Sequence, residues 1–275
     1  MAMEVTILKV GHEGEEFGKV FEYLREHPTD AFSPEIASLT EVEAKEVESG
    51  IEQEYLLSRK EFKERLQKAF PRNDPDRIAA YSKGLRKGLY KKKIPVWFLE
   101  RFSPKAADES KQTYLMAERF GKAADLSITS LDFEGFLNNY WEMMGYRQRS
   151  RDIRDREIAK NLGEAENRIR SRYPVLNSRD PLKLTMQIGA SHRPEKYTSI
   201  PVSLVDLIDP AERALESELN GAYRQGRSLE KSRRVVLAYA VWSLGRAYNW
   251  GLPTSDIQMM GEPELIETVR TRMQH

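Results

Sequence analysis

The chain has 275 residues, and its 44 Lys and Arg nearly balance its 43 Asp and Glu, which leaves a formal net charge of +1. This balance excludes the strongly basic character of a dedicated nucleic-acid-binding protein, so we expect no nucleic-acid partner. Cysteine is absent, which excludes disulfides, thiolate chemistry and sulfur-based zinc sites. Together with the 32% of charged residues, this composition indicates a cytoplasmic protein with a core of ordinary size.

The first predicted elements alternate between strand and helix. Val5–Val10 is predicted as a strand, and apolar residues at helical spacing predict a helix over 15–26. A second, short strand is predicted at Ala31–Ser33. Thr40 is predicted to cap the next helix, because Glu43 stands three residues later and completes a capping box.

The remaining predicted strands are separated by a long helical stretch. A third strand is predicted at Pro95–Leu99, and helices are predicted from about 105 to 124 and from 130 to 162. From Pro210 onward the pattern predicts three helices. The last two predicted strands cover 182–188 and 202–206.

This order of elements predicts an α/β protein. Alternating strands and helices favour a mostly parallel sheet with extensive helical cover, a large helical insertion and a C-terminal helical appendage. We expect an α/β domain over 1–208 and the appendage over 209–275. The apolar run over 235–244 is much shorter than the roughly 20 residues that span a bilayer, so no membrane span is expected. Its apolar face, which includes Val236 and Trp242, is predicted to pack on the core or on a second copy of the chain.

Ionisable residues stand at the carboxyl ends of the first four predicted strands. In an open α/β sheet, ligands bind in the crevice outside these ends, so we expect the groups to line one crevice. His12, Glu35 and His192 would suit zinc, manganese or cobalt, or would serve without metal as a general base and its orienting carboxylate. Taken singly, each is better explained as a solvated residue at a strand end, and the functional interpretation depends on their occurring together. The groups are His12 and Glu13, Glu35, Glu100 and Arg101, and His192 and Arg193.

An arginine-rich helical segment supplies a further candidate. Arg147, Arg151 and Arg154 fall on one helix face, and Asp155 is expected to pair with Arg151, four residues before it. The residues alone allow either a solvated, salt-bridged surface or an Arg154 side chain that reaches the crevice and holds a carboxylate or a phosphate bidentately. The basic run over 83–93 is interpreted as a solvated helix face rather than a phosphate-binding site.

Four short motifs carry a family resemblance. They are Gly11-His12 after the first strand, Glu35 after the second, Arg154-Asp155-x-x-Ile158-Ala159 on a helix, and Gly189-Ala190-Ser191-His192. This pattern, which extends to Asp206, resembles the TraB / pheromone-shutdown family, grouped with Tiki proteases, GumN-like proteins, erythromycin esterases and haem-binding ChaN. The family commonly has two residues between the first Gly and His, whereas Gly11 and His12 are adjacent here, so Glu13 is a neighbouring candidate.

The resemblance implies an EreA/ChaN-like fold with a pocket, in a group that includes metal-dependent proteases, lactone hydrolases and haem binders. From the residues and the resemblance together, we expect a hydrolase that acts on a peptide or an ester, with or without a divalent metal. His12, Glu35 and His192 are predicted as metal ligands or base, and Arg154 as an anion clamp. The alternative is a non-catalytic module that binds a small ligand such as haem or a peptide. The helices after Pro210 are not expected to contribute to the site.

Overall fold

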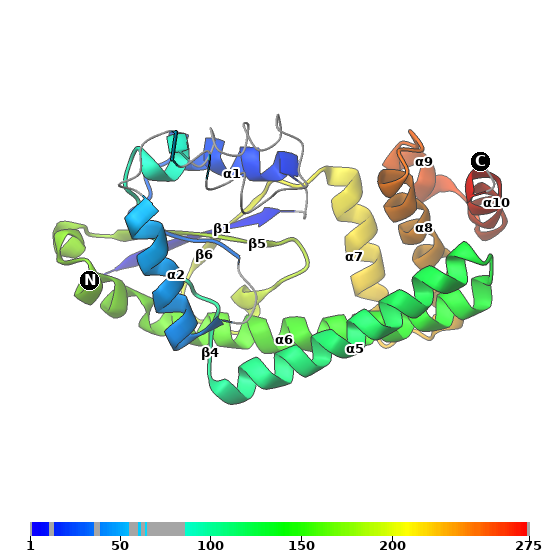
Figure 1. The fold of residues 1–275 in the computed structure, drawn as a ribbon, viewed down its shortest axis with the longest axis horizontal. Helices are drawn as coiled ribbons and strands as arrows, with labels where there is room; N and C mark the ends of the chain where they lie inside the picture. The colour runs from blue at the N-terminus through cyan, green and yellow to red at the C-terminus, as the bar shows by residue number, and fades with distance from the viewer. Residues whose placement is uncertain are drawn as a thin grey trace. The chain divides into compact units, whose positions relative to one another are not determined.

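The chain forms two compact units in the computed structural model (Figure 1). The α/β unit comprises Met1–Ala107 and Ile153–Ile208, and the helical unit comprises Asp108–Asp152 and Asp209–His275. Helix α6 (Phe133–Arg172) contributes to both units. The structure describes residues 2–10, 14–35, 39–54, 60–61, 64 and 86–273.

A four-stranded parallel sheet forms the centre of the α/β unit, as the alternation of elements predicts. Its strands are β1 (Met3–Val10), β2 (Ala31–Ser33), β5 (Leu182–Gly189) and β6 (Val202–Asp206), in the spatial order β2-β5-β1-β6. Val10 lies opposite Gly189, so β1 and β5 end at the same edge. The carboxyl ends of these two strands therefore lie side by side.

The predicted third strand at Pro95–Leu99 is reduced to a single parallel bridge between Val96 and Phe32. The backbone of Phe32 accepts from Trp97 and donates to Pro95, both at 2.9 Å. The backbone hydrogen bonds to β2 do not continue past Trp97, because side chains accept from the next two backbone N–H groups. Phe98 N donates to Glu48 Oε1 at 2.9 Å, and Leu99 N donates to Ser33 Oγ at 3.0 Å. A separate two-stranded parallel sheet follows: β4 (Arg101–Phe102), which comes directly after this segment in sequence, pairs with β3 (Leu39–Thr40).

Helices cover both faces of the sheet (Figure 1). On one face, α1 (Gly14–Glu26) buries Val20, Phe21 and Leu24 against Leu8 of the central strand. On the other, the second half of α6 buries an apolar stripe against the strands. The stripe consists of Ile158, Leu162, Ala165 and Ile169, at the spacing that puts residues on one side of a helix.

The remaining elements of the α/β unit are short, apart from α2 (Glu41–Glu54). The predicted capping box at the start of α2 is confirmed, since Thr40 N donates to Glu43 Oε2 at 2.8 Å and Glu43 N donates to Thr40 Oγ1 at 3.3 Å. A π-helical turn, η1 (Arg86–Tyr90), and two 3₁₀ turns, η2 (Pro174–Ser178) and η3 (Pro194–Lys196), complete the described part.

The helical unit has a core of its own. Leu137 of α6 packs there with Leu215, Val236 and Leu265 of the C-terminal segment. Val236 is fully buried in this core, so it is not available for the contact between copies that its sequence context suggested. Instead of three helices, four follow Asp209 in the described chain, because Met260 adopts an extended conformation and separates the last two. The helices are α5 (Pro104–Thr129), the first part of α6, α7 (Pro210–Arg224), α8 (Leu229–Ala247), α9 (Thr254–Met259) and α10 (Glu262–Met273).

The described residues contain no helix that combines the length and the apolar character needed to cross a bilayer. This agrees with the expectation from the run over 235–244, which lies inside α8 and is largely buried in the helical core.

Candidate functional site

Three of the four predicted site residues lie together where chain segments leave the carboxyl edge of the sheet. Glu35 follows β2 by two residues, His192 follows β5 by three, and Arg154 reaches them from α6. Arg154 Nη2 donates to Glu35 Oε1 at 2.8 Å, and His192 Nε2 lies 3.6 Å from the same oxygen. The fourth residue, His12, lies outside the described residues.

Asp155 fixes the orientation of the His192 imidazole. Asp155 Oδ1 is 2.6 Å from His192 Nδ1, and its Oδ2 accepts from the backbone N of Arg193 at 2.7 Å. Because an ionised carboxylate only accepts hydrogen bonds, Nδ1 is the donor, and Nε2 of the neutral ring is the acceptor. The carboxylate that we expected beside Arg151 thus contacts His192, whereas Arg151 donates to Asn220 at 2.7 Å. The sequence motif places Asp155 beside Arg154 but does not reveal this partner.

Glu100 anchors Arg154 from the other side. The Arg154 Nε and Nη2 atoms donate to the two Glu100 oxygens, each at 2.9 Å, in a bidentate pair. Nη1 of Arg154 has no hydrogen-bond partner in the described part of the chain, and the side chain is 14% exposed. Arg154 is therefore held by two carboxylates of the protein itself, one of them bidentately, and its role as an anion clamp for a ligand stays a prediction that relies on Nη1.

Burial raises the pKa of Glu100 to about 8 from an ordinary value of 4.5, since its side chain is fully buried. The nearby Arg154 opposes this shift, whereas the negative charges of Glu35 and Asp155 add to it. The folded protein thus holds a proton on Glu100 that the unfolded chain releases. Its contribution to stability is fully present below pH 4.5 and is lost as the pH rises through about 8.

We expect Glu100→Gln to weaken this pH dependence, because glutamine stays neutral over the whole range. Relative to the wild type, the variant should gain stability between pH 5 and pH 9 when both are unfolded in urea. Glu46→Gln, which removes an exposed carboxylate from α2, is the control and should follow the wild-type profile. Parallel profiles for Glu100→Gln and the wild type would contradict the raised pKa.

A buried lysine that the sequence analysis did not single out supports the turn that carries His192. Lys9 of β1 is 1% exposed, and its Nζ donates to the His192 carbonyl oxygen and, at 3.3 Å, to Glu195 Oε2. The sequence feature that could have identified Lys9 is its position between Leu8 and Val10 in an otherwise apolar strand, because a buried ammonium group needs hydrogen-bond partners.

Lys9→Met keeps the length of this side chain but removes its donor. We expect the free energy of unfolding to fall by about 1–3 kcal/mol, because the His192 carbonyl oxygen loses its charged hydrogen-bond donor. The NMR resonances of the His192 ring should shift as the turn relaxes. Lys183→Met on β5, where the lysine side chain is 40% exposed, is the matched control. Unchanged stability and unchanged His192 resonances would mean that Lys9 does not hold the turn.

Arg101 and Arg193 make no side-chain hydrogen bond to this cluster among the described residues. The Arg101 guanidinium binds other groups instead: its Nε donates to Phe98 O at 2.8 Å, its Nη1 to Glu41 at 3.0 Å, and its Nη2 to Glu48. Arg193 contributes its backbone N to Asp155. Glu13 lies outside the described residues. The cluster therefore contains Glu35, Glu100, Arg154, Asp155 and His192, with Lys9 behind the turn.

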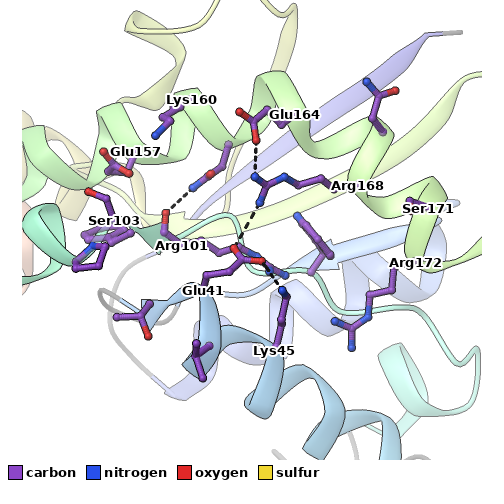
Figure 2. A pocket seen from close by; sticks show the side chains of 17 residues that line it. Glu41, Lys45, Arg101, Ser103, Glu157, Lys160, Glu164, Arg168, Ser171 and Arg172 are labelled. Carbon is purple, nitrogen blue, oxygen red and sulfur yellow. Dashed lines mark hydrogen bonds and ion pairs between the residues drawn. The ribbon is translucent and has the colours of Figure 1, made fainter.

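A separate pocket of about 1030 Å³ opens between α2, the segment around β4 and the second half of α6 (Figure 2). None of the five residues of the His192 cluster lines it. The helix α6 thus serves both places, with Arg154 and Asp155 toward the cluster and Lys160, Glu164 and Arg168 lining the pocket.

Within the described residues, no group of three or more His, Asp or Glu side chains is arranged to hold a metal ion. Two of the predicted ligand atoms, His192 Nε2 and Glu35 Oε1, do face each other at 3.6 Å. Asp155 orients His192 through Nδ1, which is the outer arrangement common around metal-binding histidines. The donor chemistry therefore fits two ligands, and the predicted third is His12.

Comparisons of the chain with protein-family models, with curated protein sequences and with solved structures gave no match. They identify no family, so the resemblance to the TraB / pheromone-shutdown family stays a prediction.

Proposed function

We propose that this protein is a hydrolase in which His192 acts as general base on a water molecule that attacks a peptide or ester carbonyl. One observation carries the proposal: His192 Nδ1 is bound to Asp155 at 2.6 Å, which leaves Nε2 as the proton acceptor. A carboxylate in this position fixes the tautomer and stabilises the imidazolium that forms. General-base catalysis of this kind contributes a factor of about 10²–10⁴ to the rate.

In the proposed reaction, Nε2 takes a proton from water as the water oxygen bonds to the carbonyl carbon. The negative charge of Glu35, 3.6 Å from Nε2, favours the protonated ring. Nη1 of Arg154 donates to the carbonyl oxygen as it becomes negative. When the tetrahedral intermediate breaks, His192 returns the proton to the leaving amine or alkoxide. His12 belongs to the proposed site on the sequence argument alone.

A metal-dependent form of the same site is the second version of this proposal. His192 Nε2, Glu35 and His12 would hold zinc, manganese or cobalt, which would supply a bound water of lowered pKa. Because Glu35 already accepts from Arg154 at 2.8 Å, metal binding would compete with that contact. Elemental analysis of the purified wild type and of His192→Ala tests this version, since the variant should lose the metal.

The proposal as a whole is tested by a screen of chromogenic esters and peptides with the wild type and His192→Ala. Turnover that disappears in the variant supports the hydrolase. Turnover of no substrate by the wild type would favour the alternative, a cytoplasmic module that binds a small ligand without catalysis. The large pocket apart from His192 favours that alternative. Haem, as one such ligand, is tested by the visible absorbance of the protein after haem is added.

A further inference from the structure

The pocket between α2 and α6 has two charged walls and an apolar base. Glu41 and Lys45 of α2 line one wall, and Lys160 and Arg168 of α6 line the other (Figure 2). Trp97 is among the apolar residues that line it and is itself 5% exposed. A volume of about 1030 Å³ is at the upper end of the range for pockets that bind small molecules.

Two of the lining arginines are fixed in place and form a rigid frame. Arg172 donates to Glu48 at 2.7 Å and to Glu52 at 3.1 Å. Arg101 donates to Glu48 as well, and its guanidinium stacks 3.7 Å from the centre of the Trp97 ring. Because the Glu48 side chain is completely buried, neither arginine is expected to leave it for a ligand.

The other lining cations are held weakly. Lys45 and Arg168 reach the same Glu41 carboxylate at 3.3 and 3.4 Å, and Arg168 also pairs with Glu164 at 2.7 Å, but the side chains of Lys45, Arg168 and Glu164 are 60%, 43% and 48% exposed. Exposed pairs of this kind contribute only about 0–1 kcal/mol, so an incoming anion can replace them. Lys160 makes no ion pair with any residue in the described part of the chain.

Among the side chains that line the pocket, cations outnumber carboxylates, while Glu48 and Glu52, which do not line it, pair with Arg101 and Arg172. Five cations line it against three carboxylates, and Glu41 is shared by three of those cations. The cations are Lys45, Arg101, Lys160, Arg168 and Arg172, and the carboxylates are Glu41, Glu157 and Glu164.

We propose that this pocket binds an organic anion whose carboxylate or phosphate group contacts Lys45, Lys160 and Arg168 while its apolar body lies against Val42 and Pro104. Because Lys45 lies on α2 and Lys160 and Arg168 lie on α6, cations on both walls would attract the anionic group. This favours a ligand that fills the space between the two helices. The apolar body would cover accessible apolar surface, since Val42 is 65% exposed and Pro104 is exposed as well. This site goes beyond the proposed hydrolase and needs no catalytic activity.

Calorimetric titration with four probes tests the proposal on the intact protein. The probes are phenyl phosphate, 3-phenylpropionate, inorganic phosphate and benzyl alcohol. The two aromatic anions should bind at least about tenfold more tightly than inorganic phosphate, because only they bury an apolar ring. Benzyl alcohol should give no measurable binding, because it lacks the charge. The tighter of the two aromatic anions shows whether the natural ligand carries a phosphate or a carboxylate.

Lys160→Gln and Arg168→Gln should each weaken binding of the tighter probe by about tenfold or more, because each removes a charged donor. Lys231→Gln and Arg272→Gln, at exposed positions of the helical unit, make the same change of charge and should bind like the wild type. His192→Ala should also bind like the wild type, whatever its activity. Equal binding by all variants, or binding lost in His192→Ala and kept in the pocket variants, would overturn the proposal.

Discussion

Arg154→Met is expected to lower the free energy of unfolding by about 3–5 kcal/mol above pH 8, where Glu100 is ionised and the substitution breaks a buried ion pair from one side. The substitution leaves Glu100 fully buried without its two bonds of 2.9 Å and removes the cation next to Glu35. Burial already raises the pKa of Glu100 to about 8, and without Arg154 it should rise further. The loss of stability should therefore be smaller at pH 6, where Glu100 is protonated with or without Arg154, and should grow as the pH rises above about 8.

A second substitution separates this cause from a general disturbance of α6. In the double variant with Glu100→Gln, the destabilisation above pH 8 should be smaller by at least about 1 kcal/mol, since position 100 then carries no charge that has lost its partner. Arg156→Met, two residues further along the same helix at an exposed position, is the control and should stay within about 0.5 kcal/mol of the wild type. Additive effects of the Arg154 and Glu100 substitutions would show that the pair is not coupled.

His192→Ala is expected to lower the rate of hydrolysis by about 10²–10⁴-fold, because it removes the proposed general base. It should also reduce stability by about 1–3 kcal/mol, more than a surface substitution. The reason is that His192 is only 3% exposed and its ring is the partner of the buried Asp155. Activity is measured with whichever ester or peptide the wild type turns over, and stability by urea unfolding.

His27→Ala is the matched control, since that ring lies exposed at the end of α1, stacked on Tyr23. It should leave the activity unchanged. Asp155→Asn should reduce activity while the His192 ring stays in place, because an amide can hold the wrong tautomer. Full activity in His192→Ala would mean that another group, such as His12, is the base.

The convergence of Glu35 and His192 could be predicted because it depends on topology alone. Parallel strands end at one edge, so residues that follow β2 and β5 come close whatever lies between them in sequence. Arg154 could be selected from its neighbours only through the family resemblance, because Arg147 and Arg151 share the same helical periodicity. The parallel sheet itself followed from the alternation of elements, and the capping box at Thr40 from a local rule.

The remaining features depend on tertiary contacts that no local pattern encodes. Asp155 and Arg151 stand four residues apart, which favours a local pair, yet the turn after β5 brings His192 to Asp155. The apolar segment at Pro95–Leu99 has the composition of a strand, but Glu48 and Ser33 take its backbone donors. In the same way, the segment 108–152 has no sequence feature that directs it to the C-terminal helices.

The position of β1 in the sheet has a consequence for synthesis on the ribosome. Its ladder partners are β5 and β6, which begin at Leu182 and Val202, far behind it in the chain. At a translation rate of about 5–20 residues per second, β1 waits roughly 9–34 s before β5 has been made. During that time its apolar side chains and unpaired backbone are open to other chains. Chaperone dependence of the nascent protein should therefore be greatest before Gly189 leaves the exit tunnel.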